Sequence, residues 1–249
     1  MKKKKRAKEN LELLKQNAYP GRGIVCGMDE TSQYLIQVYW IMGRSVNSRN
    51  RIFVDEENGT LKTEAANPDL VTDPRLIIYT AMAEKNLRYV VSNGHQTMTA
   101  VNGPAHNKLL SLLQAWEYED DAPNFTPRIT ASVFLGDEND SDNYEAEMVI
   151  LKKDEESNNC LRWHYNEKLK PGYGKCLTTY SGDGNPLPPF RGAPYLLPLK
   201  GGIEKITKII WKALNPENRV SLAVKFIDTR TGKSQMQIVN QYSQVEVES

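Results

Sequence analysis

The spacing of hydrophobic and polar positions changes along this 249-residue chain, and each spacing predicts a type of element. Apolar residues three or four positions apart predict helices. They lie at 7–17, from Gly103-Pro104 to Trp116, and after Gly202. Alternating or wholly apolar runs predict strands at 23–27, 34–41, 52–54, 76–79, 87–91, 129–134, 145–151, 161–165, 175–179, 221–227 and 235–239. The run YLIQVYWI at 34–41 is apolar at nearly every position, so we expect burial on both faces.

The order of these elements predicts the fold class. Strands dominate, and the helices come in separate blocks rather than between successive strands. This order favours an α+β fold with largely antiparallel sheets over a doubly wound α/β fold. No repeat or linker divides the chain, so we expect a basic arm with a short helix at 1–18 and a single domain at 19–249. The Gly- and Pro-rich stretch 181–198 is predicted to be an ordered loop.

The charges are nearly balanced but unevenly placed. The 32 basic and 31 acidic residues give a net charge of +1, which argues against a nucleic-acid partner. Six basic residues lie within the first eight positions, and the rest of the chain carries a net −5. Polar residues follow this basic start, so we reject a signal peptide. We expect a solvated, frayed terminus, with contact to RNA or an anionic membrane as the alternative.

Cysteine spacing and hydropathy bear on the compartment. Cys26, Cys160 and Cys176 are widely spaced and form no zinc-binding pattern, which favours reduced thiols in a cytoplasmic protein. No apolar run reaches the roughly 18 to 20 residues needed to span a bilayer, so we expect no membrane partner. The acidic stretch 137–142 lacks the glycine that a calcium-binding EF-hand loop requires, so we expect a hairpin loop there and no metal.

The densest group of hydrogen-bond donors is the segment Gly43–Arg51 (GRSVNSRNR), which follows the buried strand. It holds three arginines, and residues 31–54 contain no Asp or Glu. A guanidinium group stays charged and can donate two parallel hydrogen bonds to phosphate. We therefore favour an anion site over a solvated basic hairpin.

Three further segments could contribute to a site. Gly21-Arg22-Gly23 is at a strand entrance, where glycines permit close approach of a ligand, although a plain turn explains it better. Residues 92–97 (SNGHQT) form either a tight turn or a polar loop that faces a ligand. The crowded carboxylates of 117–121 (EYEDD) could supply a general acid or base, or form a solvated acidic turn.

Taken together, these segments resemble the archaeal-type IMP cyclohydrolase family. The ordered pieces are GRGIVCG, YWIMGRSVNSRNR, Asp73-Pro74 followed by Tyr79, VSNGHQT and YEDDAPNFTPRI. The resemblance is best over residues 20–135 and fainter at 201–240. The chain departs from the family pattern in its basic arm, in the NGHQT order, and in extra sequence around 155–198.

The resemblance implies a fold and an activity. The fold is a four-layer αββα sandwich of two stacked antiparallel sheets, as in N-terminal nucleophile hydrolases. Cys26 lies inside a predicted strand, so we expect no N-terminal nucleophile. The implied enzyme is a cyclohydrolase without a cofactor, which closes the ring of a formamidoimidazole carboxamide ribonucleotide to form IMP in de novo purine biosynthesis. The expected partner is this purine-precursor nucleotide, and the question of a homo-oligomer stays open.

The resemblance also assigns residues. The catalytic ones are Arg49, Tyr79 and Glu119, with Glu119 removing the amide proton and the other two stabilising or protonating the developing oxyanion. The substrate-binding ones are Arg22, Arg44, Ser45, Asn47, Asn93, Gly94, His95, Thr126 and Arg128. In the extra sequence, Tyr180 and Asp183 either form a structural turn, which we favour, or cover the site. The alternatives to the enzyme are a nucleotide-binding regulator without turnover, an RNA-binding protein and an autoprocessed amidohydrolase.

Overall fold

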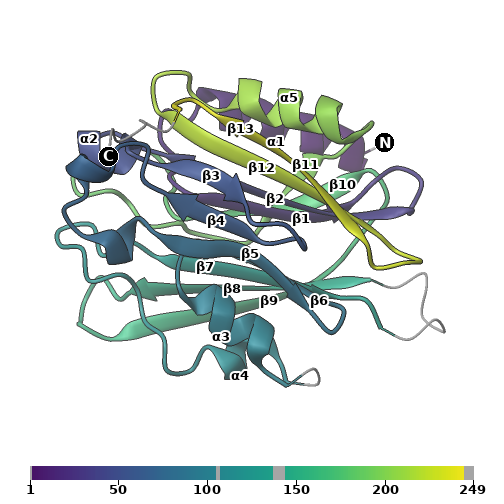
Figure 1. Ribbon diagram of the computed structural model, residues 1–249, viewed down its shortest axis with the longest axis horizontal. Helices are drawn as coiled ribbons and strands as arrows, with labels where there is room; N and C mark the ends of the chain where they lie inside the picture. Colours follow the sequence, from purple (N-terminus) through teal and green to yellow (C-terminus); the bar gives the residue numbers. More distant parts are fainter. Residues whose placement is uncertain (1, 105–106, 137–143, 244–249) are drawn as a thin grey trace, which may run out of the picture.

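Two antiparallel β-sheets are stacked face to face in the computed structural model, which describes residues 2–104, 107–136 and 144–243 (Figure 1). Sheet A has the order β11-β10-β1-β2-β12-β13, and sheet B runs from β3 to β9 in chain order. Sheet A contains β1 (Gly23–Met28), β2 (Tyr34–Met42), β10 (Tyr173–Thr178), β11 (Tyr195–Pro198), β12 (Arg219–Asp228) and β13 (Ser234–Asn240). Sheet B contains β3 (Ile52–Asp55), β4 (Leu61–Glu64), β5 (Tyr79–Lys85), β6 (Arg88–Ser92), β7 (Arg128–Phe134), β8 (Glu145–Lys153) and β9 (Cys160–Lys168). The predicted α+β sandwich is confirmed.

Helices cover the outer faces of both sheets. α1 (Lys2–Gln16) and α5 (Ile203–Ala213) pack on sheet A, while α3 (Gln96–Asn102) and α4 (Leu109–Leu112) pack on sheet B (Figure 1). The layers therefore follow the order helix, sheet, sheet, helix. The short helices α2 (Val46–Arg49), η1 (Pro68–Leu70) and η2 (Pro74–Leu76) lie in connections between strands.

Strand β2 is buried on both faces, as predicted for 34–41. Tyr39 and Ile41 contribute to the core between the sheets, and Val38 and Trp40 contribute to the core beneath α1 and α5. Side chains alternate between the two faces of a strand, so a central strand covered on both sides is apolar at nearly every position.

The predicted strand at 76–79 is wrong for residues 76–78. Pro74–Leu76 form the 3₁₀ helix η2, and β5 begins only at Tyr79. Asp73 caps this turn, because its side chain accepts a hydrogen bond from the Arg75 amide, and Pro74 fits the first position. Leu76 is consequently free to line a cavity rather than a sheet.

The helix predicted from Gly103 is shorter than expected, and a neighbouring helix was missed. Gly103 ends α3, and α4 covers only Leu109–Leu112. The last two residues of the predicted 92–97 loop, Gln96 and Thr97, belong to α3. Strands β4 and β11 were also missed. Each has only four residues, β4 is largely polar, and β11 lies within the Gly- and Pro-rich stretch 181–198 that was predicted to be a loop.

The basic arm is helical rather than frayed. Residues 2–8 form the first turns of α1, with their charged side chains exposed to solvent. Ala7 and Leu14 are buried and anchor the helix on sheet A. The acidic stretch 137–142 lies outside the described residues, although β7 and β8 on either side of it pair antiparallel, as a hairpin requires.

Close packing around Gly23 leads to a prediction about the stability of the protein. A Cβ atom at Gly23 would lie 2.0 Å from the Trp40 ring across the β1–β2 pair. The ring is fully buried, so Gly23→Ala is expected to lower the free energy of unfolding by about 1–3 kcal/mol through overpacking. Urea unfolding measures this loss. Gly202→Ala is the matched control, because a Cβ there meets nothing within 4 Å; equal losses in both variants would contradict the packing argument.

Candidate functional site

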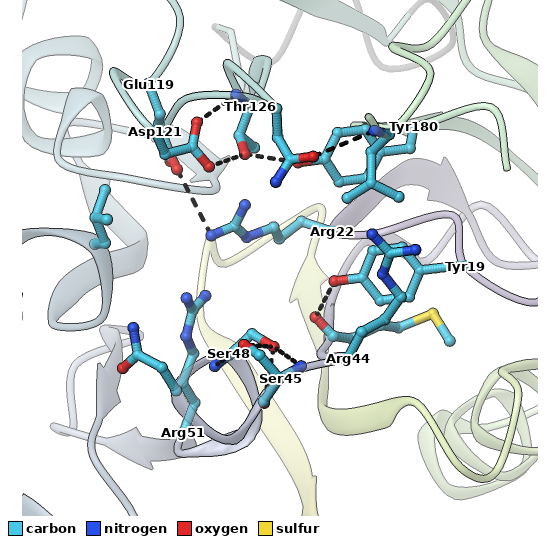
Figure 2. Close-up of a pocket in the computed structure, with 15 residues that line it drawn as sticks. Tyr19, Arg22, Arg44, Ser45, Ser48, Arg51, Glu119, Asp121, Thr126 and Tyr180 are labelled. Atoms are coloured by element: carbon cyan, nitrogen blue, oxygen red, sulfur yellow. Dashed lines mark hydrogen bonds and ion pairs between the residues drawn. The ribbon is translucent and has the colours of Figure 1, made fainter. Parts of the chain in front are cut away.

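A cavity of about 260 Å³ lies where the start of β1, the end of β2 and the loop before β7 meet (Figure 2). Most of the side chains around it are polar. The lining consists of Tyr19, Arg22, Met42, Arg44, Ser45, Asn47, Ser48, Arg51, Leu76, Glu119, Asp121, Asn124, Thr126, Tyr180 and Leu187. It therefore collects residues from five separate segments of the chain.

A capping box shapes the arginine-rich wall. The Ser45 hydroxyl accepts a hydrogen bond from the Ser48 amide at 3.1 Å, and the Ser48 hydroxyl accepts one from the Ser45 amide at 2.8 Å. These reciprocal bonds begin α2 immediately after the buried strand β2. The resulting single turn sends the arginines at 44, 49 and 51 in different directions.

Arg44 and Arg49 are both held by protein groups. Arg44 is paired with Asp183, donates to the Gly184 carbonyl at 2.9 Å and lies over the Tyr19 ring. Arg49 Nε donates to the Gly43 carbonyl at 3.1 Å, and its Nη2 lies 3.4 Å from Asn218 Oδ1. Arg44 lines the cavity, but Arg49 does not.

Arg51 points into the cavity, although only 4% of it is exposed (Figure 2). Its Nε has no hydrogen-bond partner among the described residues, and no carboxylate described in the structure forms an ion pair with it. Burial lowers the pKa of Arg51, and nearby Arg22 lowers it further, yet a guanidinium group remains charged at neutral pH. A buried, unpaired cation of this kind calls for an anionic ligand.

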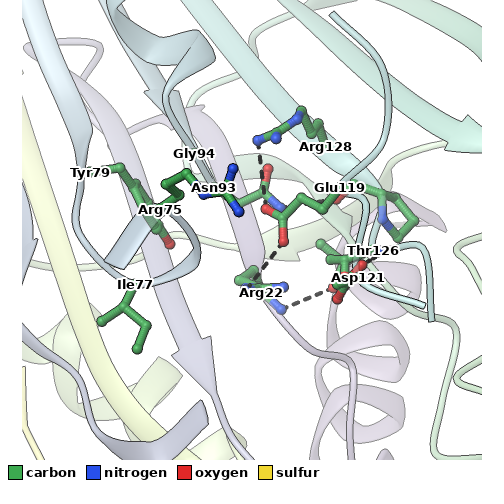
Figure 3. A network of polar contacts seen from close by, with 12 residues as sticks. Arg22, Arg75, Ile77, Tyr79, Asn93, Gly94, Glu119, Asp121, Thr126 and Arg128 are labelled. Atoms are coloured by element: carbon green, nitrogen blue, oxygen red, sulfur yellow. Dashed lines mark hydrogen bonds and ion pairs between the residues drawn. The ribbon is translucent and has the colours of Figure 1, made fainter. Parts of the chain in front are cut away.

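Glu119 lies between two further arginines (Figure 3). Its Oε2 is 3.6 Å from Arg22 Nη2, and its Oε1 is 3.6 Å from Arg128 Nη1. Only 3% of Glu119 is exposed, and Oε2 accepts no hydrogen bond from a described residue. Burial raises the pKa of this carboxyl, and the two arginines oppose that shift. A carboxylate with a raised pKa in a cavity can accept a proton.

The polar loop at 92–97 lies behind Arg128 rather than in the cavity wall. Asn93 Oδ1 accepts hydrogen bonds from the Ile129 amide at 2.8 Å and from Gln96 Nε2 at 3.1 Å. A Cβ at Gly94 would lie 2.5 Å from Arg128 Nη1, so glycine makes room for this guanidinium. His95 is exposed, with Nε2 3.2 Å from the Arg75 carbonyl oxygen.

Tyr79 is buried at the start of β5, with its hydroxyl 2.7 Å from the Tyr39 hydroxyl. It does not line the cavity, and its ring centroid lies 6.2 Å from that of His95. Of the residues assigned from the sequence, the structure thus gathers Arg22, Arg44, Ser45, Asn47, Glu119 and Thr126 around the cavity. Arg128 contacts Glu119 but does not itself line the cavity. The other assigned residues outside the lining are Arg49, Tyr79, Asn93, Gly94 and His95.

Several cavity residues were missed in the sequence. Arg51, Asp121 and Asn124 belong to motifs that were singled out, but their directions depend on turns that spacing does not reveal. Tyr19 and Tyr180, which stack with ring centroids 6.0 Å apart, come from segments distant in sequence. Tyr180 had been considered as a cover for the site, and it does line the cavity.

Other chemistry is limited by burial. Burial raises the pKa of the Cys26 thiol to about 12, so this thiol is a poor nucleophile at neutral pH. The described residues contain no group of three or more His, Cys, Asp and Glu side chains placed to hold a metal ion. Within the described ranges, no helix combines the length and apolar character needed to cross a membrane.

The fold and the cavity define an α+β sandwich protein with a cationic pocket around a buried carboxylate. Comparison with known protein families identifies the family of this chain. A family model described as IMP cyclohydrolase-like protein matches residues 19–232, and the chain belongs to this family. No protein with a curated description matches the chain.

Proposed function

We propose that this protein is an IMP cyclohydrolase, which closes the ring of 5-formamidoimidazole-4-carboxamide ribonucleotide to form IMP. The observation that carries the proposal is a single cavity lined both by the unpaired Arg51 guanidinium and by the buried Glu119 carboxylate. The family assignment supports a reaction of this type. The position of both groups in a confined space supports chemistry on an anionic substrate.

Unsatisfied polar atoms in the cavity wall support ligand binding. Arg51 Nε, Arg22 Nε and Asn47 Oδ1 are buried without hydrogen-bond partners among the described residues. Such atoms cost free energy unless a ligand or water satisfies them. We assign Arg22, Arg44, Ser45 and Asn47 to the phosphate, ribose and carboxamide of the nucleotide. Thr126 lines the same cavity and Arg128 contacts Glu119, whereas the substrate-binding roles of Asn93, Gly94 and His95 stay predictions.

The proposed reaction forms one bond and breaks another. The carboxamide nitrogen attacks the formyl carbon, and Glu119 accepts the proton that this nitrogen loses. Guanidinium groups stabilise the negative charge on the former formyl oxygen. The C–O bond then breaks as the formamido nitrogen loses its own proton and forms the ring C=N bond. The oxygen leaves as water, carrying the two protons that the carboxamide and formamido nitrogens lose. Both reacting groups belong to one substrate, so the cavity must hold them in a near-attack arrangement.

Two assignments from the family resemblance stay predictions. Arg49 was assigned to the oxyanion, but its side chain does not line the cavity. Arg51 lines it without an ion-pair partner among the described residues, so we propose Arg51 for that role. Tyr79 was assigned to the same oxyanion, and its buried hydroxyl is hydrogen-bonded with that of Tyr39. Substitution of each residue tests these roles.

The proposal is tested by following ring closure of the formylated ribonucleotide by absorbance. The purified full chain is expected to turn over the substrate, with water and IMP as products. Binding of IMP without turnover would instead support the nucleotide-binding regulator. A protein that neither binds IMP nor turns over the formylated ribonucleotide would contradict both.

The pH dependence of the reaction follows from the burial of Glu119. A general base must be deprotonated, so kcat/KM is expected to fall as the pH drops through the pKa of Glu119. Because burial raises that pKa above the ordinary value of 4.5, the acidic limb lies above that value. Rate measurements across the acidic range locate the limb, and a limb at or below 4.5 would count against Glu119 as the base.

A further inference from the structure

The segment 180–190, rich in glycine and proline, forms an ordered wall of the cavity. The Tyr180 amide donates to the Pro20 carbonyl at 3.2 Å, and the Phe190 amide donates to the Thr179 carbonyl at 3.0 Å. The side chain of Asp183 pairs with Arg44, and the Leu187 amide donates to Asn124 Oδ1 at 3.2 Å. The segment is thus tied both to the arginine-rich wall and to the loop that carries Glu119.

A chain of hydroxyl groups links Tyr180 to the Glu119 loop (Figure 2). Thr126 Oγ1 donates its hydrogen to Asp121 Oδ2 at 2.5 Å. A threonine hydroxyl has one hydrogen, so the Tyr180 hydroxyl must be the donor in its 2.6 Å bond to Thr126 Oγ1. The direction of the chain is therefore fixed from Tyr180 through Thr126 to Asp121.

Thr126 also holds the backbone of Glu119. Its carbonyl oxygen accepts a hydrogen bond from the Glu119 amide at 2.9 Å, and its own amide donates to Asp121 Oδ1 at 2.6 Å. Residues 117–127 contain no helix or strand, so these bonds replace the regular backbone pairing that would otherwise fix the loop. Four hydrogen bonds meet at Thr126, which is itself buried.

We propose that Tyr180 is a positioning residue for Glu119. Its hydroxyl orients Thr126, and Thr126 fixes the loop that places the Glu119 carboxylate between Arg22 and Arg128. This inference rests on the proposed function, because it gives Glu119 the role of base. Among the described residues, Tyr180 is the donor to Thr126 Oγ1, so loss of its hydroxyl leaves that oxygen without a donor. The loop then gains freedom without losing a group that touches the reacting atoms.

The first test measures ring closure by Tyr180→Phe, Thr126→Val and the double variant in the full chain. Tyr180→Phe is expected to lower kcat roughly tenfold, the scale of one lost hydrogen bond, and to shift the acidic limb of the pH profile. The double variant is expected to be no slower than Thr126→Val alone, because Tyr180 acts through Thr126. Wild-type kcat in Tyr180→Phe, or multiplied losses in the double variant, would overturn the inference.

Tyr165→Phe is the matched control. Its hydroxyl donates to the Gly192 carbonyl at 2.8 Å, just beyond the same segment, but Tyr165 does not line the cavity. This variant loses one tyrosine hydroxyl hydrogen bond and is expected to keep the wild-type rate and pH profile. A loss equal to that of Tyr180→Phe would show that the segment's general stability, not the link to Thr126, controls the rate.

The second test needs no turnover and separates this inference from the proposed function. The Glu119 amide donates to Thr126, so its hydrogen exchange reports directly on the loop. Exchange in the ligand-free protein is expected to accelerate about fivefold or more in Tyr180→Phe and to stay unchanged in Tyr165→Phe. If the wild type lacks cyclohydrolase activity but this acceleration is seen, the proposed function fails and the positioning of Glu119 stands. An unchanged exchange rate overturns the positioning whatever the activity.

Discussion

Glu119→Gln is expected to lower kcat by roughly 10²- to 10⁴-fold, the usual contribution of a positioned general base. Glutamine keeps the size of the side chain but cannot accept the amide proton. The substrate contacts lie on other residues, so KM is expected to change much less than kcat. Steady-state kinetics by absorbance measures both constants.

Two controls accompany this substitution. Glu117→Gln makes the same chemical change two residues away on an exposed side chain and is expected to retain wild-type activity. Binding of IMP to the Glu119→Gln variant shows whether the pocket survives the substitution. Retention of kcat within about threefold of the wild type would rule out Glu119 as the base, since even a weak general base contributes more than that.

Arg51→Met is expected to lower kcat/KM by roughly 10²- to 10³-fold, as when one donor to a developing oxyanion is removed. Methionine retains the apolar part of the side chain and removes the charge. Because the Arg51 Nε is buried without a partner in the described structure, the substitution is expected to leave the free energy of unfolding unchanged or higher. Kinetics and urea unfolding of the same preparation test both effects.

Arg49→Met provides the comparison within the same segment. Arg49 donates to the Gly43 carbonyl and contacts Asn218, so its loss is expected to lower the free energy of unfolding by about 1–2 kcal/mol. Its effect on kcat/KM is expected to be the smaller of the two. The reverse pattern, with a large kinetic loss only in Arg49→Met, would return the oxyanion role to Arg49.

The sequence predicted the larger parts of this fold because they depend on periodicity. The run at 34–41 is apolar at nearly every position, which predicts a strand covered on both faces, and β2 is such a strand. Short elements contain too few residues to show a periodicity, as in β4 with its sequence LKTE. Leu76 was placed in a strand because it is apolar, but Asp73 and Pro74 dictate a turn instead.

The candidate site was located from sequence only to the level of segments. The acidic run 117–121 was identified, yet burial alone distinguishes Glu119 from its exposed neighbours Glu117 and Asp120. Arg49 and Arg51 are equally good anion ligands by residue type, and the single turn of α2 decides which of them reaches the cavity. Such directions arise from tertiary contacts, such as the bond between Arg49 and Gly43, that no local spacing encodes.

The unpaired charge of Arg51 couples the stability of this protein to the supply of its ligand. An anion that binds only the folded state shifts the folding equilibrium by mass action, and the gain grows with the logarithm of its concentration. The cavity therefore affects the stability of the protein as well as its chemistry. When the anionic ligand is scarce, a larger fraction of the chains unfolds and becomes open to proteolysis, so ligand supply would help set how much of the protein a cell retains.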